Sequence, residues 1–96
     1  MLALLLMVGG KMITEEINER IQVTAEHCAG RIYPTKFAWK NRIYFVDKVH
    51  SYWKERVSEF RLEHHLSVTT GGPDMYELIF DPQKLTWRLG RVLLEG

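Results

Sequence analysis

The residues best suited to chemistry in this chain are its four histidines and its single cysteine. His27 is adjacent to Cys28, and His64 is adjacent to His65. On a strand, adjacent side chains point to opposite faces, so neither pair can give two ligands to one metal ion. There is no Cys-x-x-Cys, no His-x-His and no histidine pair at helical spacing, and a lone cysteine forms no internal disulfide. We therefore predict no metal centre and no cofactor.

Groupings for acid–base or nucleophilic catalysis are equally sparse. Gly71-Gly72 precedes a strand pattern and not a helix, so it is typical of a turn and not of a phosphate-binding loop. His64 falls on the inward side of its predicted strand, where a neutral imidazole needs a hydrogen-bond partner. Asp47 could share a pocket with it, although an ion pair with Lys36 across a hairpin is the simpler interpretation. We predict that the protein is not an enzyme, with the His64–Asp47 pair as the remaining alternative.

Cations and aromatic rings form the third grouping. Six rings lie between Phe37 and Trp53, around a turn at Lys40-Asn41. Proteins that bind single-stranded nucleic acid combine cations, which follow the phosphates, with exposed rings, which stack on bases for roughly 1–3 kcal/mol each. The candidate binding surface comprises the cations of this region and of the last predicted strand: Lys36, Lys40, Arg42, Arg88 and Arg91.

The alternative for the same rings is structural. Phe37, Trp39 and Tyr44 share one predicted face with Val46, as residues that fill the core of a small barrel do. Their cations would then be an ordinary solvated surface.

Size and charge limit the possible functions. A chain of 96 residues makes one domain. Thirteen Lys and Arg against twelve Asp and Glu leave a net charge of +1, which lacks the footprint of a dedicated duplex-binding domain. The single cysteine fits a reducing cytoplasm.

Residues 1–12 form an apolar N-terminal extension ahead of a single β domain expected over 13–96. The extension is far shorter than the ~20 residues that span a bilayer, and it lacks the basic region and the cleavage pattern of a signal peptide. Met12 follows Gly9-Gly10-Lys11, whose codons can resemble a bacterial ribosome-binding sequence. We therefore hypothesise that Met12 is the true start, which detection of Met1 by N-terminal sequencing would refute.

Period-two alternation predicts most of the domain to be β-strand. A two-residue turn at Lys40-Asn41 would place Phe37 opposite Tyr44 and Trp39 opposite Arg42. The predicted strands are 21–25, 31–39, 42–49, 60–69, 76–80 and 86–94. One helical turn is expected within 13–18, capped by its Thr14-Glu15-Glu16 start. At 51–60 a short helix or an irregular connection is expected to interrupt the strands.

Details of the pattern assign side chains to faces. Pro34 indicates an edge position or a bulge, because proline cannot donate a ladder hydrogen bond. Asp81-Pro82-Gln83-Lys84 predicts a type I turn. The expected inward set is Phe60, Leu62, His64, Leu66, Val68, Tyr76, Leu78, Phe80, Trp87, Leu89 and Leu93, and Arg61, Glu63, His65, Ser67 and Thr69 are expected outside.

These elements predict an all-β fold with one or two short helical segments. Five or six strands joined by tight turns form an antiparallel meander. We expect the meander to curl into a small or half-open barrel, since curling hides sheet edges that would otherwise pair with other chains.

The aromatic pattern also resembles a known family. Its residues are Phe37-x-Trp39-x-x-Arg42-x-Tyr44-x-Val46, then Val49 and Trp53, then Tyr76-Glu77-Leu78, then Trp87-Arg88-Leu89 with Val92. This run resembles a small bacterial domain of unknown function, which occurs alone and as the C-terminal tail of catalytically inactive, Y-family-polymerase-like proteins of the DNA-damage mutasome type.

The similarity spans residues 17–94, with Asn41 where the family has a glycine in the turn. The resemblance implies a non-catalytic accessory module that works near DNA-repair proteins, and it transfers no active-site residue.

The expected function is therefore that of a cytoplasmic, non-catalytic binding module with a protein or single-stranded nucleic acid as its partner and no membrane association. The alternative is a structural homo-oligomer that pairs through an edge strand or through the apolar segment 1–8. A monomer and a small homo-oligomer both remain open.

Overall fold

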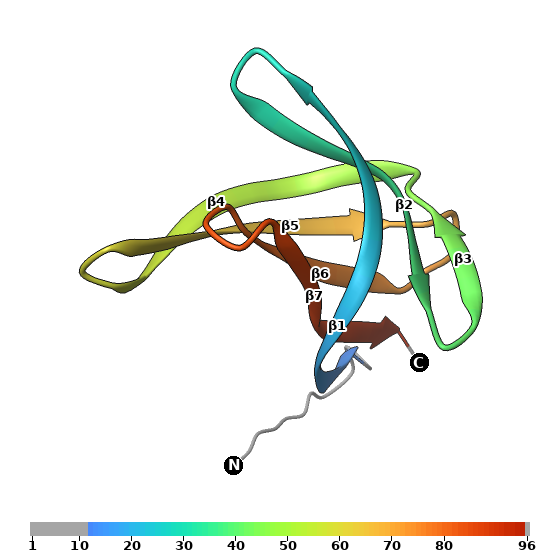
Figure 1. Ribbon diagram of the computed structural model, residues 1–96. Coiled ribbons are helices and arrows are strands. Elements are labelled where there is room, and N and C mark those ends of the chain that lie inside the picture. Colours follow the sequence, from blue (N-terminus) through green and yellow to red (C-terminus); the bar gives the residue numbers. More distant parts are fainter. Residues whose placement is uncertain (1–11, 96) are drawn as a thin grey trace.

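The computed structural model describes residues 12–95, and it shows a single sheet of seven antiparallel strands (Figure 1). The predicted N-terminal extension therefore lies, apart from Met12, outside the described residues. The strands are β1 (Met12–Cys28), β2 (Arg31–Trp39), β3 (Arg42–Phe45), β4 (Lys48–Ser58), β5 (Arg61–Thr69), β6 (Met75–Asp81) and β7 (Thr86–Glu95).

The strand order is β3-β2-β1-β7-β6-β5-β4. Each pair of consecutive strands forms a hairpin except β3 and β4, and the first strand instead pairs with the last, with Met12 opposite Glu95. β1 pairs with β7 over residues 12–21 and with β2 over residues 22–28, so the sheet turns a corner along this strand (Figure 1). The all-β prediction is confirmed, and the sheet is curled but not closed.

The opening lies between β3 and β4 and is bridged by the two residues that join them. The N–H of Val46 donates to the Thr35 carbonyl at 2.9 Å, and the N–H of Asp47 donates to the Thr69 carbonyl at 2.7 Å. The short link therefore ties both sides of the opening together at one end.

The β2–β3 hairpin follows the predicted register. Phe37 lies opposite Tyr44 and Trp39 opposite Arg42, and φ is 52° at Lys40 and 61° at Asn41. Positive φ at both turn residues is the geometry whose twist matches that of the flanking strands, and asparagine tolerates it well.

The predicted helical segments are wrong, and bulges explain the larger error. The region 51–60 belongs to β4 and to the β4–β5 turn. Register shifts at 49–51 and 56–58 break the two-residue period, so the apolar residues of β4 fall at intervals that imitate a helix. Phe60 lies in the turn and is 80% exposed, not inward as predicted. Residues 14–16 pair with β7 as part of β1. With β4 included, the strands number seven instead of five or six.

Further bulges reset the alternation in other strands. The ladder between β1 and β2 shifts next to Pro34, which confirms the bulge that proline indicated. In β7, Leu89 pairs with Leu78 and Arg91 with Glu77, which leaves Gly90 as the extra residue. Val92 consequently enters the core at 2% exposure, while Leu93, the predicted inward residue, is only half-buried.

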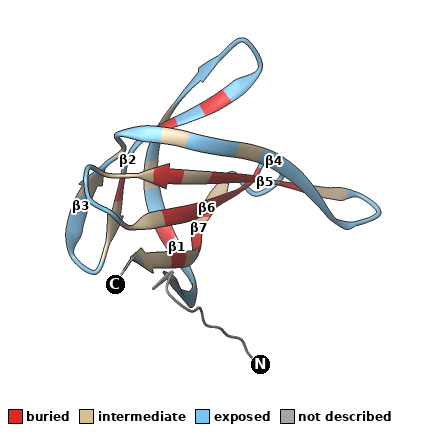
Figure 2. Cartoon of the chain, turned by 180° about the vertical axis from the view of Figure 1, so that it is seen from behind, coloured by how far each residue is buried: buried red, intermediate tan, exposed pale blue. Residues whose placement is uncertain are grey.

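The opposite face of β5, β6 and β7 is also covered, which the alternation did not predict. Glu63 is 1% exposed and His65 7% exposed, although both were expected outside. Figure 2 shows most of the buried segments along these three strands, while the hairpin tips are exposed. We call this opposite side the outer face; Arg88 and Gly90 of β7 lie on it.

Candidate nucleic-acid interface

The cations of the β2–β3 hairpin are exposed, and each lies over an aromatic ring. Such contacts keep the positive charge at the surface while the stem of the side chain covers apolar area. The pairs, measured to the ring centroid, are Lys40 over Trp39 at 4.7 Å, Arg42 over Tyr44 at 5.4 Å and Lys36 over Phe45 at 6.0 Å.

Apolar surface accompanies these charges. Phe45 is 66% exposed and Ile43 56% exposed, and both belong to the short edge strand β3. Trp39 is half-buried, and its Nε1 donates to Glu19 Oε1 at 3.1 Å, which fixes the indole against β1. In the β2–β3 ladder Lys36 pairs with Phe45 and Ala38 with Ile43, so Phe45 and Ile43 lie on the same side of the hairpin as Lys36, while Arg42 shares the other side with Trp39.

The remaining rings of the region serve the core. Phe37 stacks on Tyr44 with centroids 5.1 Å apart, and Tyr76 approaches Tyr44 at 5.5 Å. Tyr76 is 7% exposed, and burial, with Tyr44 and Asp74 nearby, raises the pKa of its phenol above 10.0. Of the three rings in the structural alternative, Phe37 is therefore a core residue, whereas Trp39 and Tyr44 are half-buried and pack against the core.

Arg88 and Arg91 lie on β7 in a different environment. Arg88 makes two bonds to Glu63, with Nη1 at 2.9 Å from Oε2 and Nη2 at 3.3 Å from Oε1. Arg91 Nη2 lies 3.3 Å from Glu77 Oε2. Hydrogen bonding by Arg88, aided by Arg61 and opposed by burial, lowers the pKa of the Glu63 carboxyl. Both arginines of β7 are therefore balanced by carboxylates beneath them.

The predicted surface is accordingly divided. Lys36, Lys40 and Arg42 lie together on the β2–β3 hairpin, while Arg88 and Arg91 lie across β1 on β7. Sequence reasoning missed two exposed cations near Arg88, namely Arg20 of β1 and Lys84 of the β6–β7 turn. The signal for Arg20 was present, because it precedes the inward residue Ile21 and must face outward.

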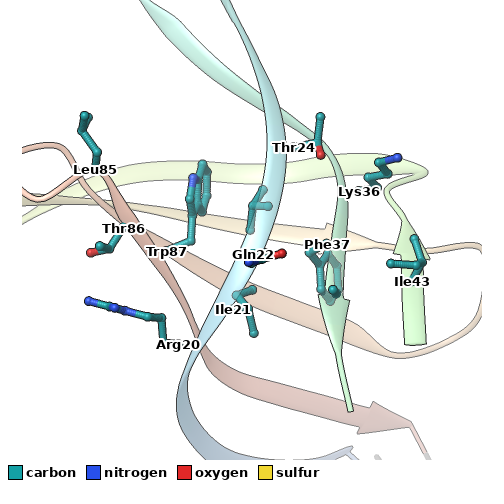
Figure 3. Close-up of a pocket in the computed structure, with 12 residues that line it drawn as sticks. Arg20, Ile21, Gln22, Thr24, Lys36, Phe37, Ile43, Leu85, Thr86 and Trp87 are labelled. Carbon is teal, nitrogen blue, oxygen red and sulfur yellow. The ribbon is translucent and has the colours of Figure 1, made fainter. Parts of the chain in front are cut away.

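A hollow of about 500 Å³ connects the two regions. It lies where β1 leaves β7, between the last β7 pair at Ile21 and the first β2 pair at Gln22. Figure 3 shows Lys36 and Ile43 on one side of β1 and Arg20 with Leu85 on the other.

His64, the histidine considered for catalysis, has a structural partner. The hydroxyl of Tyr52 is 2.7 Å from His64 Nδ1, and burial, with Lys54 and His65 nearby, lowers the pKa of the His64 imidazole. Asp47 lies beside Thr69, five residues further along β5, or roughly 16 Å at the rise of a strand. The structure does not bring His64 and Asp47 together.

Metal-ligating groups are also dispersed over the described residues. Among them, no three histidine, cysteine or carboxylate side chains are placed to hold an ion. His65 instead stacks on Trp53 at 5.2 Å, with Nε2 3.1 Å from Glu55 Oε1.

Between residues 12 and 95 no helix has the length and apolar character needed to cross a membrane.

Comparison with known proteins gives no relative. No family model matches this chain, and neither does any curated protein or any solved structure.

Proposed function

We propose that this protein is a non-catalytic module that binds single-stranded nucleic acid through the β2–β3 hairpin. The observation that carries the proposal is the state of the hairpin cations. Lys36, Lys40 and Arg42 lie over rings and form no ion pair with a carboxylate in the described part of the chain. Their charge is therefore available to phosphates.

The apolar residues of β3 favour a single strand over a duplex. Bases of a single strand are unstacked and can lie on an exposed ring, whereas the bases of a duplex are enclosed in its stack. Phe45, with two-thirds of its surface exposed beside Lys36, supplies such a ring. The net charge of +1 also suits a local contact better than a long duplex track.

The biological setting is part of the same proposal. The resemblance of residues 17–94 to tails of inactive polymerase-like proteins supports an accessory role beside DNA-repair proteins. In that role the domain would hold a single strand and leave the chemistry to its partner.

Self-association through an edge strand is the second candidate, and one feature favours it. β4 is an edge strand of eleven residues with one unpaired side. The two bulges and the cations Lys48, Lys54 and Arg56 on β4 are, however, devices by which natural sheets avoid edge pairing. Sedimentation that gave a concentration-dependent dimer, abolished by proline in β4, would favour this candidate over the first.

Binding of a labelled single-stranded oligonucleotide, followed by fluorescence anisotropy at low salt, tests the proposed function. We expect the wild-type protein to bind with an affinity that falls steeply with salt, because phosphate contacts release counterions. The double variant K40E/R42E should lose binding. Lys54→Glu, an exposed lysine on the opposite edge strand, is the control and should bind as the wild type does. No binding by the wild type, or equal loss in the control, would refute the proposal.

A further inference from the structure

The outer face of β1 and β7 contains a pair of like charges that nothing in the fold requires. Arg20 lies directly opposite Arg88 in the β1–β7 ladder. Side chains at such positions have Cβ atoms about 5 Å apart, and like charges there destabilise a sheet. Glu63 balances Arg88, but Arg20 forms no ion pair or hydrogen bond with any described residue.

The surroundings of this pair are cationic. A hollow of about 450 Å³ on the outer face is lined by Arg20, Arg61, Lys84 and Arg88, with Asp81 as its one carboxylate. Asp81 Oδ1 already accepts the backbone N–H groups of the β6–β7 turn, and its Oδ2 lies 3.5 Å from Arg61 Nε. Even with Glu63 counted beneath Arg88, this region keeps more cations than carboxylates.

This cationic hollow adjoins the hollow that reaches the hairpin. Both hollows are lined by Arg20, Thr86 and Trp87. The hollow of about 500 Å³ extends from there to Lys36 of β2. Figure 3 shows Arg20 and Lys36 on the two sides of β1. Exposed cations therefore continue from the hairpin to the β6–β7 turn along one face of the sheet.

We infer that this outer face is a second phosphate-binding segment, which extends the hairpin site so that one single strand follows Lys36, Arg20 and Lys84 in succession. The inference rests on the proposed function and adds to it the path of the strand and two residues that hold it. Arg88 does not hold the strand in this proposal, because its guanidinium is already paired with Glu63. An anionic occupant also accounts for Arg20, because a phosphate would balance the member of the Arg20–Arg88 pair that no described carboxylate balances.

The length of the oligonucleotide separates this inference from the proposed function. Small single-strand-binding folds occupy about 4 to about 16 nucleotides. We therefore compare oligonucleotides of about 5 and about 15 nucleotides on the wild type, on R20E/K84E, on K40E/R42E and on the control Lys54→Glu. R20E/K84E should bind the short oligonucleotide as the wild type does and the long one at least tenfold more weakly. For the long oligonucleotide, the slope of log affinity against log salt should become shallower in this variant by about 1.4, because two phosphate contacts are lost.

Each other outcome decides between the claims. If R20E/K84E binds the long oligonucleotide as the wild type does while K40E/R42E does not, the outer-face path is wrong and the hairpin site stands. If R20E/K84E loses both lengths equally, the outer face is the main site and the extension is wrong. If the wild type binds neither length, both claims fall.

Thermal unfolding tests whether the variant R20E/K84E is still folded, so that weaker binding is not caused by unfolding. Arg20 and Lys84 are exposed, and glutamate at position 20 would face Arg88 with opposite charge. R20E/K84E should therefore melt at a temperature equal to or above that of the wild type while binding the long oligonucleotide more weakly. The neutral variant R20Q/K84Q loses the same two phosphate contacts, so it should show the same direction of binding defect with a change in slope of about 1.4. A normal affinity in it would contradict the inference.

Discussion

The β2–β3 hairpin and the outer face of β5–β7 both carry cations, yet these cations have different partners. Lys40 and Arg42 lie over rings, whereas Arg88 lies over a carboxylate, Glu63, that is 1% exposed. A ring leaves the charge of its cation free to attract an anion, whereas a buried carboxylate neutralises the charge of the cation that pairs with it. The partner beneath a cation therefore decides whether the cation stabilises the fold or is available for binding.

The energies of the two arrangements differ in the same direction. Removing one member of a buried ion pair leaves an uncompensated charge and costs about 3–5 kcal/mol. A cation over an exposed ring contributes about 0.5–1 kcal/mol. Substitutions in the two regions should thus affect different measurements.

The largest expected effect is on stability at the outer face. Arg88→Met should lower the free energy of unfolding by about 3 kcal/mol, because Glu63 then keeps only Arg61, whose side chain is itself partly exposed, and the imidazole of His65 at 3.6 Å. Lys40→Met, the matched change in the hairpin, should cost less than about 1 kcal/mol. Urea denaturation measures both, and similar costs would show that the two regions are not distinct.

Lowering the pH should reduce the stability of the fold through two groups, His64 and Glu63, because the pKa of each is lowered in the folded state. Because the unfolded chain then binds more protons, each group stabilises the fold fully at a pH above its pKa in the unfolded chain. That stabilisation is lost as the pH falls through the pKa of the group in the folded state. For His64, kept neutral by burial, the loss begins below pH 6.5, and for Glu63 it begins below pH 4.5.

Unfolding measured from pH 8 to pH 3 should therefore show a decline in two stages. Glu63→Gln should be less stable than the wild type at pH 7 and should approach it at the acid end. His64→Gln should flatten the stage that begins near pH 6.5. A wild-type stability that rose on acidification would contradict both assignments.

The smallest effect on stability is expected at Phe45 in the hairpin. Because its ring is mostly exposed, Phe45→Ser should change the free energy of unfolding by less than about 0.5 kcal/mol. Binding of single-stranded oligonucleotide should nevertheless weaken about fivefold to a hundredfold, the range for loss of one stacked base. Unchanged binding would remove the ring from the interface and leave only its cations.

Local chemistry made the hairpin predictable from sequence. Lys40-Asn41 sets the turn, the turn sets the register, and the register places Phe37 beside Tyr44 without help from distant residues. The inward sets of β5 and β6 were predictable for a similar reason, since Leu66, Val68 and Leu78 lie in regular ladders.

Bulges and curling set the limit of prediction. An extra residue at Gly90 exchanges Leu93 for Val92 in the core, and no side-chain pattern shows where such a residue falls. The burial of Glu63 depends on Arg88, which is 25 residues away in sequence, and on the curvature of the whole sheet. Of the five predicted binding residues, the three of the hairpin are exposed and the two of β7 are half-buried. The rings and carboxylates that they contact were visible only in three dimensions.

The pairing of β1 with β7 has a consequence for how the protein is made. A nascent chain can form the hairpins one at a time, but it cannot complete the sheet until the ribosome has released β7. Non-local strand pairing of this kind slows folding, because a long loop must close before its contacts form. If the two ends were joined and the backbone were cut at Val46–Asp47, the same seven strands would follow one another in spatial order, and the permuted protein should refold faster.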